Sequence, residues 1–243
     1  MTVASEETLD DLTIGGIQIL QAKSGYRFSL DPVLLNGFVS HVKNARVIDL
    51  GTGNGIIPLL LSVRNEASSI TGVELQQSMV ERAWRTVQLN KLEETIKIVQ
   101  ADIRELPKEL SAGGFDVVTT NPPYRKVETG RVAPNDERAF ARHELSGGIE
   151  DFLRAAAFLL SPSGRFFVVY LAERLAEILS GMRFFQIEPK RLRTIHSRQG
   201  ESARMVLIEG RKNGKMGMTV ESPLIVYTGK GRAYTDEVLA MYQ

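Results

Sequence analysis

Short runs of β-branched and other apolar residues alternate with amphipathic helical patterns through most of this 243-residue chain. The runs that we expect to be strands are 45–50, 69–74, 96–100, 115–120 and 165–171. This alternation predicts a mostly parallel sheet that helices cover on both faces, which is a doubly wound α/β fold. Such folds bind ligands outside the carboxyl ends of the strands, where strand order reverses. The residues that follow each strand are therefore the first candidates for a site.

The regions around these strands give further expectations. Residues 1–13 hold four acids and no base, and we expect a frayed tail there. Asp31 is expected to cap a helix that runs from about 32 to 42, with Pro32 at its first position. Ser78 and Glu81 have the spacing of a capping box. Other expected strands are 17–20, 184–192, 203–209 and 222–228, and other helices are 149–160, 172–180 and 235–241.

We expect one domain with two appendages. The α/β domain spans 44–210, an N-terminal extension (1–43) packs on it, and a C-terminal extension (211–243) is not independent. Residues 125–147 are expected to form a long polar loop, and a loop of this length in a compact domain is usually functional.

Composition narrows the possible chemistry. The chain has no cysteine, which excludes disulfides, thiolate nucleophiles and cysteine-based metal sites, and no metal is expected. The longest nearly apolar run, Ile56 to Val63, is too short to span a bilayer. The acidic N-terminus is the opposite of the start of a signal peptide. We expect a cytoplasmic protein with no membrane partner, as a monomer or weak dimer.

A glycine-rich turn, Gly51-Thr52-Gly53-Asn54-Gly55, follows the strand that ends near Asp49. Glycines let the backbone pass close to a ligand and turn sharply into a helix, although any α/β protein can have such a turn. The third glycine comes one residue earlier than in the dinucleotide fingerprint, which disfavours a NAD-dependent oxidoreductase.

The pattern resembles the first motif of the Rossmann-like S-adenosylmethionine-dependent methyltransferases. That resemblance implies a seven-stranded, mostly parallel sheet with an antiparallel last strand, preceded by a short N-terminal strand and helix. It also implies S-adenosylmethionine as cofactor and S-adenosylhomocysteine as product. Gly51, Thr52, Gly53 and Gly55 would contact the cofactor, and Asp49 would lie near its amino-acid moiety.

Acidic residues end the next two strands. Glu74, followed by Leu75, is placed to accept both ribose hydroxyls of a cofactor, and the alternative is a surface acid. Asp102 is placed to hold the adenine amino group, with Ala101 and Ile103 beside the ring, and the alternative is a helix cap. The order of these motifs along the chain favours a methyltransferase more strongly than any one motif does.

Asn121-Pro122-Pro123-Tyr124 follows the fourth strand, where two prolines must end the ladder. It resembles the (N/D/S)PP(Y/F/W) motif of methyltransferases that modify a planar nitrogen, chiefly adenine N6 or a glutamine amide. The Asn121 side-chain oxygen and the Pro122 backbone oxygen would accept the two N–H groups of the amine and stabilise its developing positive charge. Tyr124 would stack on the base. On its own, however, the motif could be no more than a turn.

A narrower resemblance covers residues from about 17 to 210. The segments 28–39, 47–61, 121–126, 141–144 and 197–209 are similar to the tRNA(Val) adenine-37 N6-methyltransferase family. The resemblance implies methylation of an adenosine N6 beside an anticodon. By position, Phe28 and Asp31 match the segment that lines the cofactor's methionine end, although a core aromatic and a helix cap are equally good interpretations.

Basic residues gather late in the chain. Arg183 to Arg232 contains eleven Lys and Arg against four Asp and Glu, whereas the whole chain carries a net charge of +1. RNA phosphates are natural partners of such a segment, and a solvated basic surface is the alternative. The candidate substrate and RNA contacts are Pro123, Arg125, Lys126, Arg142, Lys190, Arg191, Arg193 and Arg198.

Two other functions share parts of this pattern. A glutamine N5-methyltransferase that acts on a protein, such as a release factor, would share the NPPY motif. That group typically carries a helical domain before the first motif, and here only about 44 residues precede it, too few for such a domain. A non-catalytic RNA-binding module is disfavoured because Asp49, Glu74 and Asn121 are all present.

Overall fold

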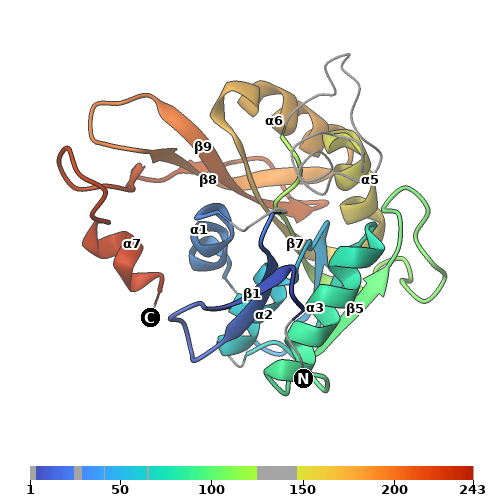
Figure 1. Cartoon of the computed structure of the whole chain (residues 1–243). Coiled ribbons are helices and arrows are strands. Elements are labelled where there is room, and N and C mark those ends of the chain that lie inside the picture. The colour runs from blue at the N-terminus through green and yellow to red at the C-terminus, as the bar shows by residue number, and fades with distance from the viewer. Residues whose placement is uncertain (1–3, 25–28, 41, 65, 125–146, 243) are drawn as a thin grey trace, which may run out of the picture.

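A computed structural model describes residues 4–24, 29–40, 42–64, 66–124 and 147–242. Its centre is a nine-stranded sheet in the order β10-β8-β9-β7-β6-β3-β4-β5, with β11 also paired to β8 (Figure 1). The strands are β3 (Arg46–Leu50), β4 (Ser69–Glu74), β5 (Ile96–Gln100), β6 (Phe115–Thr120), β7 (Leu160–Leu171), β8 (Ile187–His196), β9 (Ala203–Lys212), β10 (Thr219–Val220) and β11 (Leu224–Ile225).

The seven longer strands form the predicted doubly wound sheet. They are parallel except for β9, the last of the seven, which is antiparallel to both of its neighbours, β7 and β8. β3 pairs with β4 on one side and with β6 on the other, so strand order reverses at β3. This fold class was predicted from the sequence, and β4, β5 and β6 have the predicted bounds.

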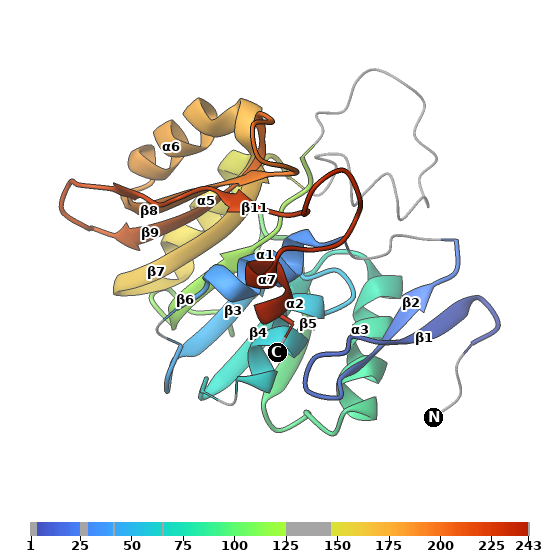
Figure 2. The ribbon, with the colours of Figure 1, turned by 90° about the vertical axis from the view of Figure 1, so that its left-hand side faces the viewer.

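Helices cover both faces of this sheet (Figures 1 and 2). On one face, α1 (Asp31–Phe38), α2 (Ile56–Val63), α3 (Gln77–Leu89) and the short α7 (Asp236–Ala240) enclose one apolar core. On the other face, α5 (Ile149–Leu159) and α6 (Leu175–Phe184), which follows the 3-10 turn η2 (Ala172–Arg174), enclose a second core. In the described part of the chain, no helix combines the length and the apolar character that a membrane crossing requires.

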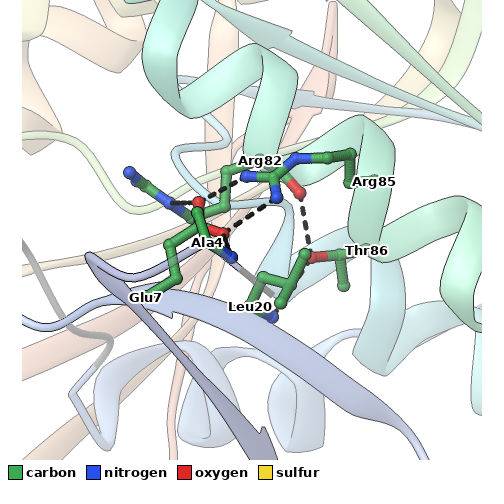
Figure 3. A network of polar contacts seen from close by, with 6 residues as sticks. All are labelled: Ala4, Glu7, Leu20, Arg82, Arg85 and Thr86. Atoms are coloured by element: carbon green, nitrogen blue, oxygen red, sulfur yellow. Dashed lines mark hydrogen bonds and ion pairs between the residues drawn. The ribbon is translucent and has the colours of Figure 1, made fainter. Parts of the chain in front are cut away.

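Residues 4–13 do not form a frayed tail, so that prediction was wrong for the described part of the segment, and residues 1–3 lie outside the described residues. β1 (Glu7–Asp11) and β2 (Gln18–Ala22) form an antiparallel hairpin that lies beside α3. Glu7 is buried, and its carboxylate accepts hydrogen bonds from Arg82, at 3.1 Å, and from Arg85 (Figure 3). The acid that seemed to belong to a solvated tail is therefore half of a buried ion pair.

The two predicted helix caps were also wrong. Leu30 occupies the N-cap of α1, and Asp31 lies inside the first turn, where it accepts a hydrogen bond from the Ser29 hydroxyl at 2.8 Å. α3 begins at Gln77 after an N-cap at Gln76, so Ser78 is already helical. α1 also ends at Phe38 instead of about residue 42, because Val39 adopts an extended backbone conformation.

Candidate active site

One pocket lies at the carboxyl ends of the strands, where strand order reverses. It is built from the loop after β3, the end of β4, the residues after β5 and those after β6. Nine residues that the sequence singled out as site candidates line it together: Gly51, Thr52, Gly53, Glu74, Leu75, Ala101, Ile103, Asn121 and Pro123. The fold thus brings together residues that are separated by up to 72 positions in the chain.

The glycine loop needs its glycines for two different reasons. Gly51, Gly53 and Gly55 all have positive φ angles, of 67°, 58° and 82°, which other residues rarely adopt. A Cβ on Gly51 would also lie 3.1 Å from the Phe152 ring, so the loop packs tightly on α5. Gly55 does not line the pocket, and a Cβ there would lie 3.3 Å from that of Ala83 on α3.

Glu74 is held rigidly in the pocket wall. It is buried, and its two oxygens accept the backbone N–H groups of Gly53 and Gln76, each at 2.9 Å. Burial raises the pKa of this carboxyl above its ordinary value, against the effect of these hydrogen bonds. A carboxylate has about four lone-pair sites, so acceptor capacity remains for hydroxyl groups of a ligand.

The polar atoms of the pocket suit a ligand with several polar groups. Both side-chain amide atoms of Asn54 are buried and have no hydrogen-bond partner within the described residues. A buried polar group without a partner is costly, so these atoms favour a polar ligand. Met79 and Ile103 also line the pocket, and their apolar side chains suit packing against a flat ring. The residues present therefore fit S-adenosylmethionine, which combines an amino acid, a ribose and an adenine.

Asp49 lies outside the pocket lining. It is fully buried, and its Oδ1 accepts a hydrogen bond from the Thr119 hydroxyl at 2.8 Å. Burial raises the pKa of Asp49 to about 7. A direct contact between Asp49 and the cofactor stays a prediction, whereas its contact with β6 is seen in the structure.

The other predicted cofactor contacts lie around the pocket. Asp102 is bonded to the Arg104 guanidinium, which lowers the pKa of the carboxyl, and only its neighbours Ala101 and Ile103 line the pocket. Asp31 adjoins Pro32, which does line it, and burial raises the pKa of Asp31. Phe28 falls outside the described residues. The roles given to Asp102, Asp31 and Phe28 remain predictions.

The NPPY segment forms a braced elbow at the end of β6. Asn121 and Pro123 line the pocket, whereas Pro122 is buried outside it. The Tyr124 hydroxyl donates a hydrogen bond to Asn121 Oδ1, and the Tyr124 ring meets Tyr170 edge to face at 5.9 Å. Arg174 donates a hydrogen bond to the Tyr124 backbone oxygen at 2.9 Å. The elbow is therefore fixed to the end of β7 and to η2.

The predicted RNA-contact residues on β8 and its turn have partners within the protein. Lys190 donates to the Lys215 backbone oxygen at 3.0 Å. Arg191 pairs with Glu209 and Glu221, and Arg193 and Arg198 bind the C-terminal extension. RNA contact by these four residues stays a prediction, as it does for Arg125, Lys126 and Arg142, which lie outside the described residues.

Several pocket residues were not predicted from the sequence. Asn54 lies between two glycines of the motif, so its place in the loop was a usable signal. Gln76 follows Glu74, the acid at the end of β4, by two positions, and this placement was a weaker signal. Met79 and Phe152 resembled ordinary core positions of helices, and nothing in the local pattern distinguishes a pocket wall from a core.

The chain is similar to known methyltransferases in sequence and in fold. Residues 31–180 match the family described as methyltransferase small domain. A protein named tRNA1(Val) (adenine(37)-N6)-methyltransferase from Haemophilus influenzae is 27% identical over 94% of this chain and 95% of its own. A protein of the same name from Porphyromonas gingivalis is also 27% identical, over 79% of this chain and 76% of its own length. A solved structure described as a predicted O-methyltransferase from Agrobacterium tumefaciens matches with a TM-score of 0.70 and 25% identity. The match covers 87% of this chain and 95% of that one.

Proposed function

The chain belongs to the methyltransferase small domain family, and from this we propose that it transfers a methyl group from S-adenosylmethionine to N6 of an adenosine in tRNA. The names of the relatives specify the acceptor as adenine 37 of a valine tRNA, and we propose the same position for this chain. The observation that carries the proposal is the place of Asn121, which lines the cofactor pocket and belongs to the NPPY elbow.

The elbow suits a nitrogen that is a poor nucleophile. The lone pair of an exocyclic amine is delocalised into the ring, so the amine must become pyramidal before it attacks. Asn121 Oδ1 and the Pro122 backbone oxygen are the proposed acceptors for its two N–H groups, and they stabilise positive charge that develops on nitrogen. The bound cofactor supplies a methyl group already activated on a sulfonium. Placement of the amine by rigid acceptors therefore supplies much of the acceleration.

Access for the base follows from the same elbow. An adenine inside a stacked loop must leave the stack before its N6 reaches a pocket of this kind. Tyr124 follows Pro123 of the pocket lining and is braced by Tyr170 and Arg174, and its ring is the proposed stacking surface for the extruded base. The same residues could accept a glutamine amide, which also presents a planar nitrogen.

Methyl transfer from labelled S-adenosylmethionine to total tRNA and to a protein fraction tests the proposal. We expect label in tRNA, recovered as N6-methyladenosine by mass spectrometry of the nucleosides. A valine tRNA transcript with adenosine 37 replaced by guanosine is the matched control, and it should take up no label. Label found in glutamine of the protein fraction, with none in adenosine, would overturn the proposal.

A further inference from the structure

Two loops of the second half of the chain leave the sheet at the same edge as the NPPY elbow. β8 and β7 are both antiparallel to β9, so β8 runs in the same direction as β7, β6 and β3. β11 is parallel to β8. The turn after β8 and the loop after β11 therefore emerge at the carboxyl edge, where Asn121 follows β6 (Figure 2 shows the loop after β11 in dark red).

Arg198, in the β8–β9 turn, ties these two loops together. Its guanidinium donates to the backbone oxygens of Gly229 at 2.9 Å and Gly231 at 3.0 Å. It also lies 5.5 Å from the centroid of the Tyr227 ring. The inward side of the loop after β11 is thus occupied by an arginine of the turn.

The loop after β11 is closed at its own base. Tyr227 and Tyr234 form a β-bridge, and their rings stack with centroids 5.5 Å apart. Inside that bridge, the Thr228 N–H donates to the Ala233 backbone oxygen at 2.9 Å. A loop fixed in this way loses little conformational entropy when a ligand binds to it.

Three exposed cations lie on or beside this pair of loops. Arg204 is the second residue of β9, just after the β8–β9 turn and beside the end of β7, and Lys230 and Arg232 lie in the loop after β11. All three are exposed, and none of their side chains has a hydrogen bond or ion pair with another described residue. Glu173 lies in the same hollow as Arg204, and Glu201 is 3.5 Å from Arg198. In contrast to Arg198, which binds the backbone of the loop, these three cations are available to a partner.

We propose that Arg204, Lys230 and Arg232 form a phosphate-binding patch that holds the backbone of the RNA substrate beside the methyl-transfer site. The patch rests on the proposed function, because it identifies how that substrate is held. Guanidinium forks and an ammonium suit phosphate oxygens, and a fixed array of cations suits the regular charges of an RNA backbone. The C-terminal extension thereby becomes part of the substrate-binding surface.

The test compares two variants that lose the same charge. In the patch variant, Arg204→Ala, Lys230→Ala and Arg232→Ala are combined. In the control, Lys97→Ala, Arg211→Ala and Lys215→Ala are combined; these cations are also exposed and lie toward the opposite edge of the sheet. Binding to a valine tRNA is measured over a range of salt concentrations, and S-adenosylmethionine affinity by calorimetry confirms that each variant is folded.

The patch predicts a specific change in salt dependence. The slope of log Kobs against log salt should become shallower by about three in the patch variant, about one for each phosphate-binding cation that is removed. The control should keep the slope of the unaltered protein. Equal slopes in the two variants would overturn the patch while leaving the proposed function intact. Failure of the unaltered protein to methylate tRNA would overturn the proposed function, and the patch with it.

Discussion

The hydroxyl of Tyr124 donates a hydrogen bond to the side-chain oxygen of Asn121. A carboxamide oxygen has two lone pairs, so this bond fixes the carboxamide and leaves one acceptor site for an amine. Tyr124 therefore positions Asn121, in addition to offering a stacking surface. The relationship between the two residues links the proposed stacking residue to the group that is proposed to hold the acceptor nitrogen.

Tyr124→Phe removes the hydroxyl and keeps the ring. Because one neutral hydrogen bond contributes roughly 0.5–1.5 kcal/mol, we expect kcat for tRNA to fall about two- to tenfold, with cofactor affinity unchanged. Tyr124→Ala should lower kcat further, because it also removes the stacking surface. Single-turnover methylation measures both. A Tyr124→Phe protein as fast as the unaltered one would refute the positioning role.

Glu74→Gln tests the wall of the pocket. The substitution removes the charge that accepts two backbone N–H groups and is proposed to accept ribose hydroxyls. We expect the Kd for S-adenosylmethionine to rise by about tenfold or more, since hydrogen bonds to a charged group contribute roughly 1.5–3 kcal/mol. Calorimetry measures the affinity. Glu81→Gln, on the exposed side of α3, is the control and should bind as the unaltered protein does.

Glu7→Ala tests how the N-terminal hairpin is held. The substitution removes the buried carboxylate that pairs with Arg82, whose side chain is 10% exposed. Breaking one partner of a buried pair costs about 3–5 kcal/mol, and we expect a fall of about 3 kcal/mol in the free energy of unfolding in urea. Glu6→Ala, on the neighbouring exposed residue, should change little. Equal stability of the two variants would show that the ion pair does not hold the hairpin.

Asp49→Asn tests the buried carboxyl beside the glycine loop. Burial raises the pKa of Asp49 in the folded protein to about 7, above its ordinary value of 3.8. Folding therefore favours the protonated form, and the stability that this group contributes at low pH is lost as pH rises through about 7.

Asparagine cannot ionise, so the variant should lose less stability between pH 5 and pH 8 than the unaltered protein, by about 2–3 kcal/mol, because about two pH units of that window lie below the raised pKa. Urea unfolding at the two pH values measures it. Asp116→Asn is the control: Arg46 lowers the pKa of Asp116 below its ordinary value of 3.8, so the contribution of this group is lost only below that pH, and the profile of the variant from pH 5 to pH 8 should parallel that of the unaltered protein. Parallel pH profiles for Asp49→Asn and the unaltered protein would contradict the raised pKa.

The strand ends could be predicted from the sequence because the signals there are local. Val117 to Thr120 must leave the ladder at Pro122, and the glycine loop must turn at Gly51. The topology of a parallel sheet then brings the ends of β3, β4, β5 and β6 to one pocket. Asn121 and Glu74 could be placed in a common site on that argument.

Long-range partners could not be predicted in this way. Glu7 pairs with Arg82 and Arg85, which follow it by 75 and 78 positions in the chain. Without α3 beside it, the ETLDD strand has the composition of a solvated tail. The partners of the basic segment between Arg183 and Arg232 could not be predicted from the sequence either. Its charges were evident, but only the structure distinguishes Arg198, which binds the C-terminal loop, from Lys230 and Arg232, which are exposed.

Methyl transfer by Asn121→Ala measures the central claim most directly. The substitution removes the proposed acceptor for the amine, so we expect formation of N6-methyladenosine in tRNA to be abolished while calorimetry shows S-adenosylmethionine binding retained. Asn121→Asp keeps an acceptor oxygen and should keep part of the activity. Full methylation of tRNA by Asn121→Ala would contradict the account.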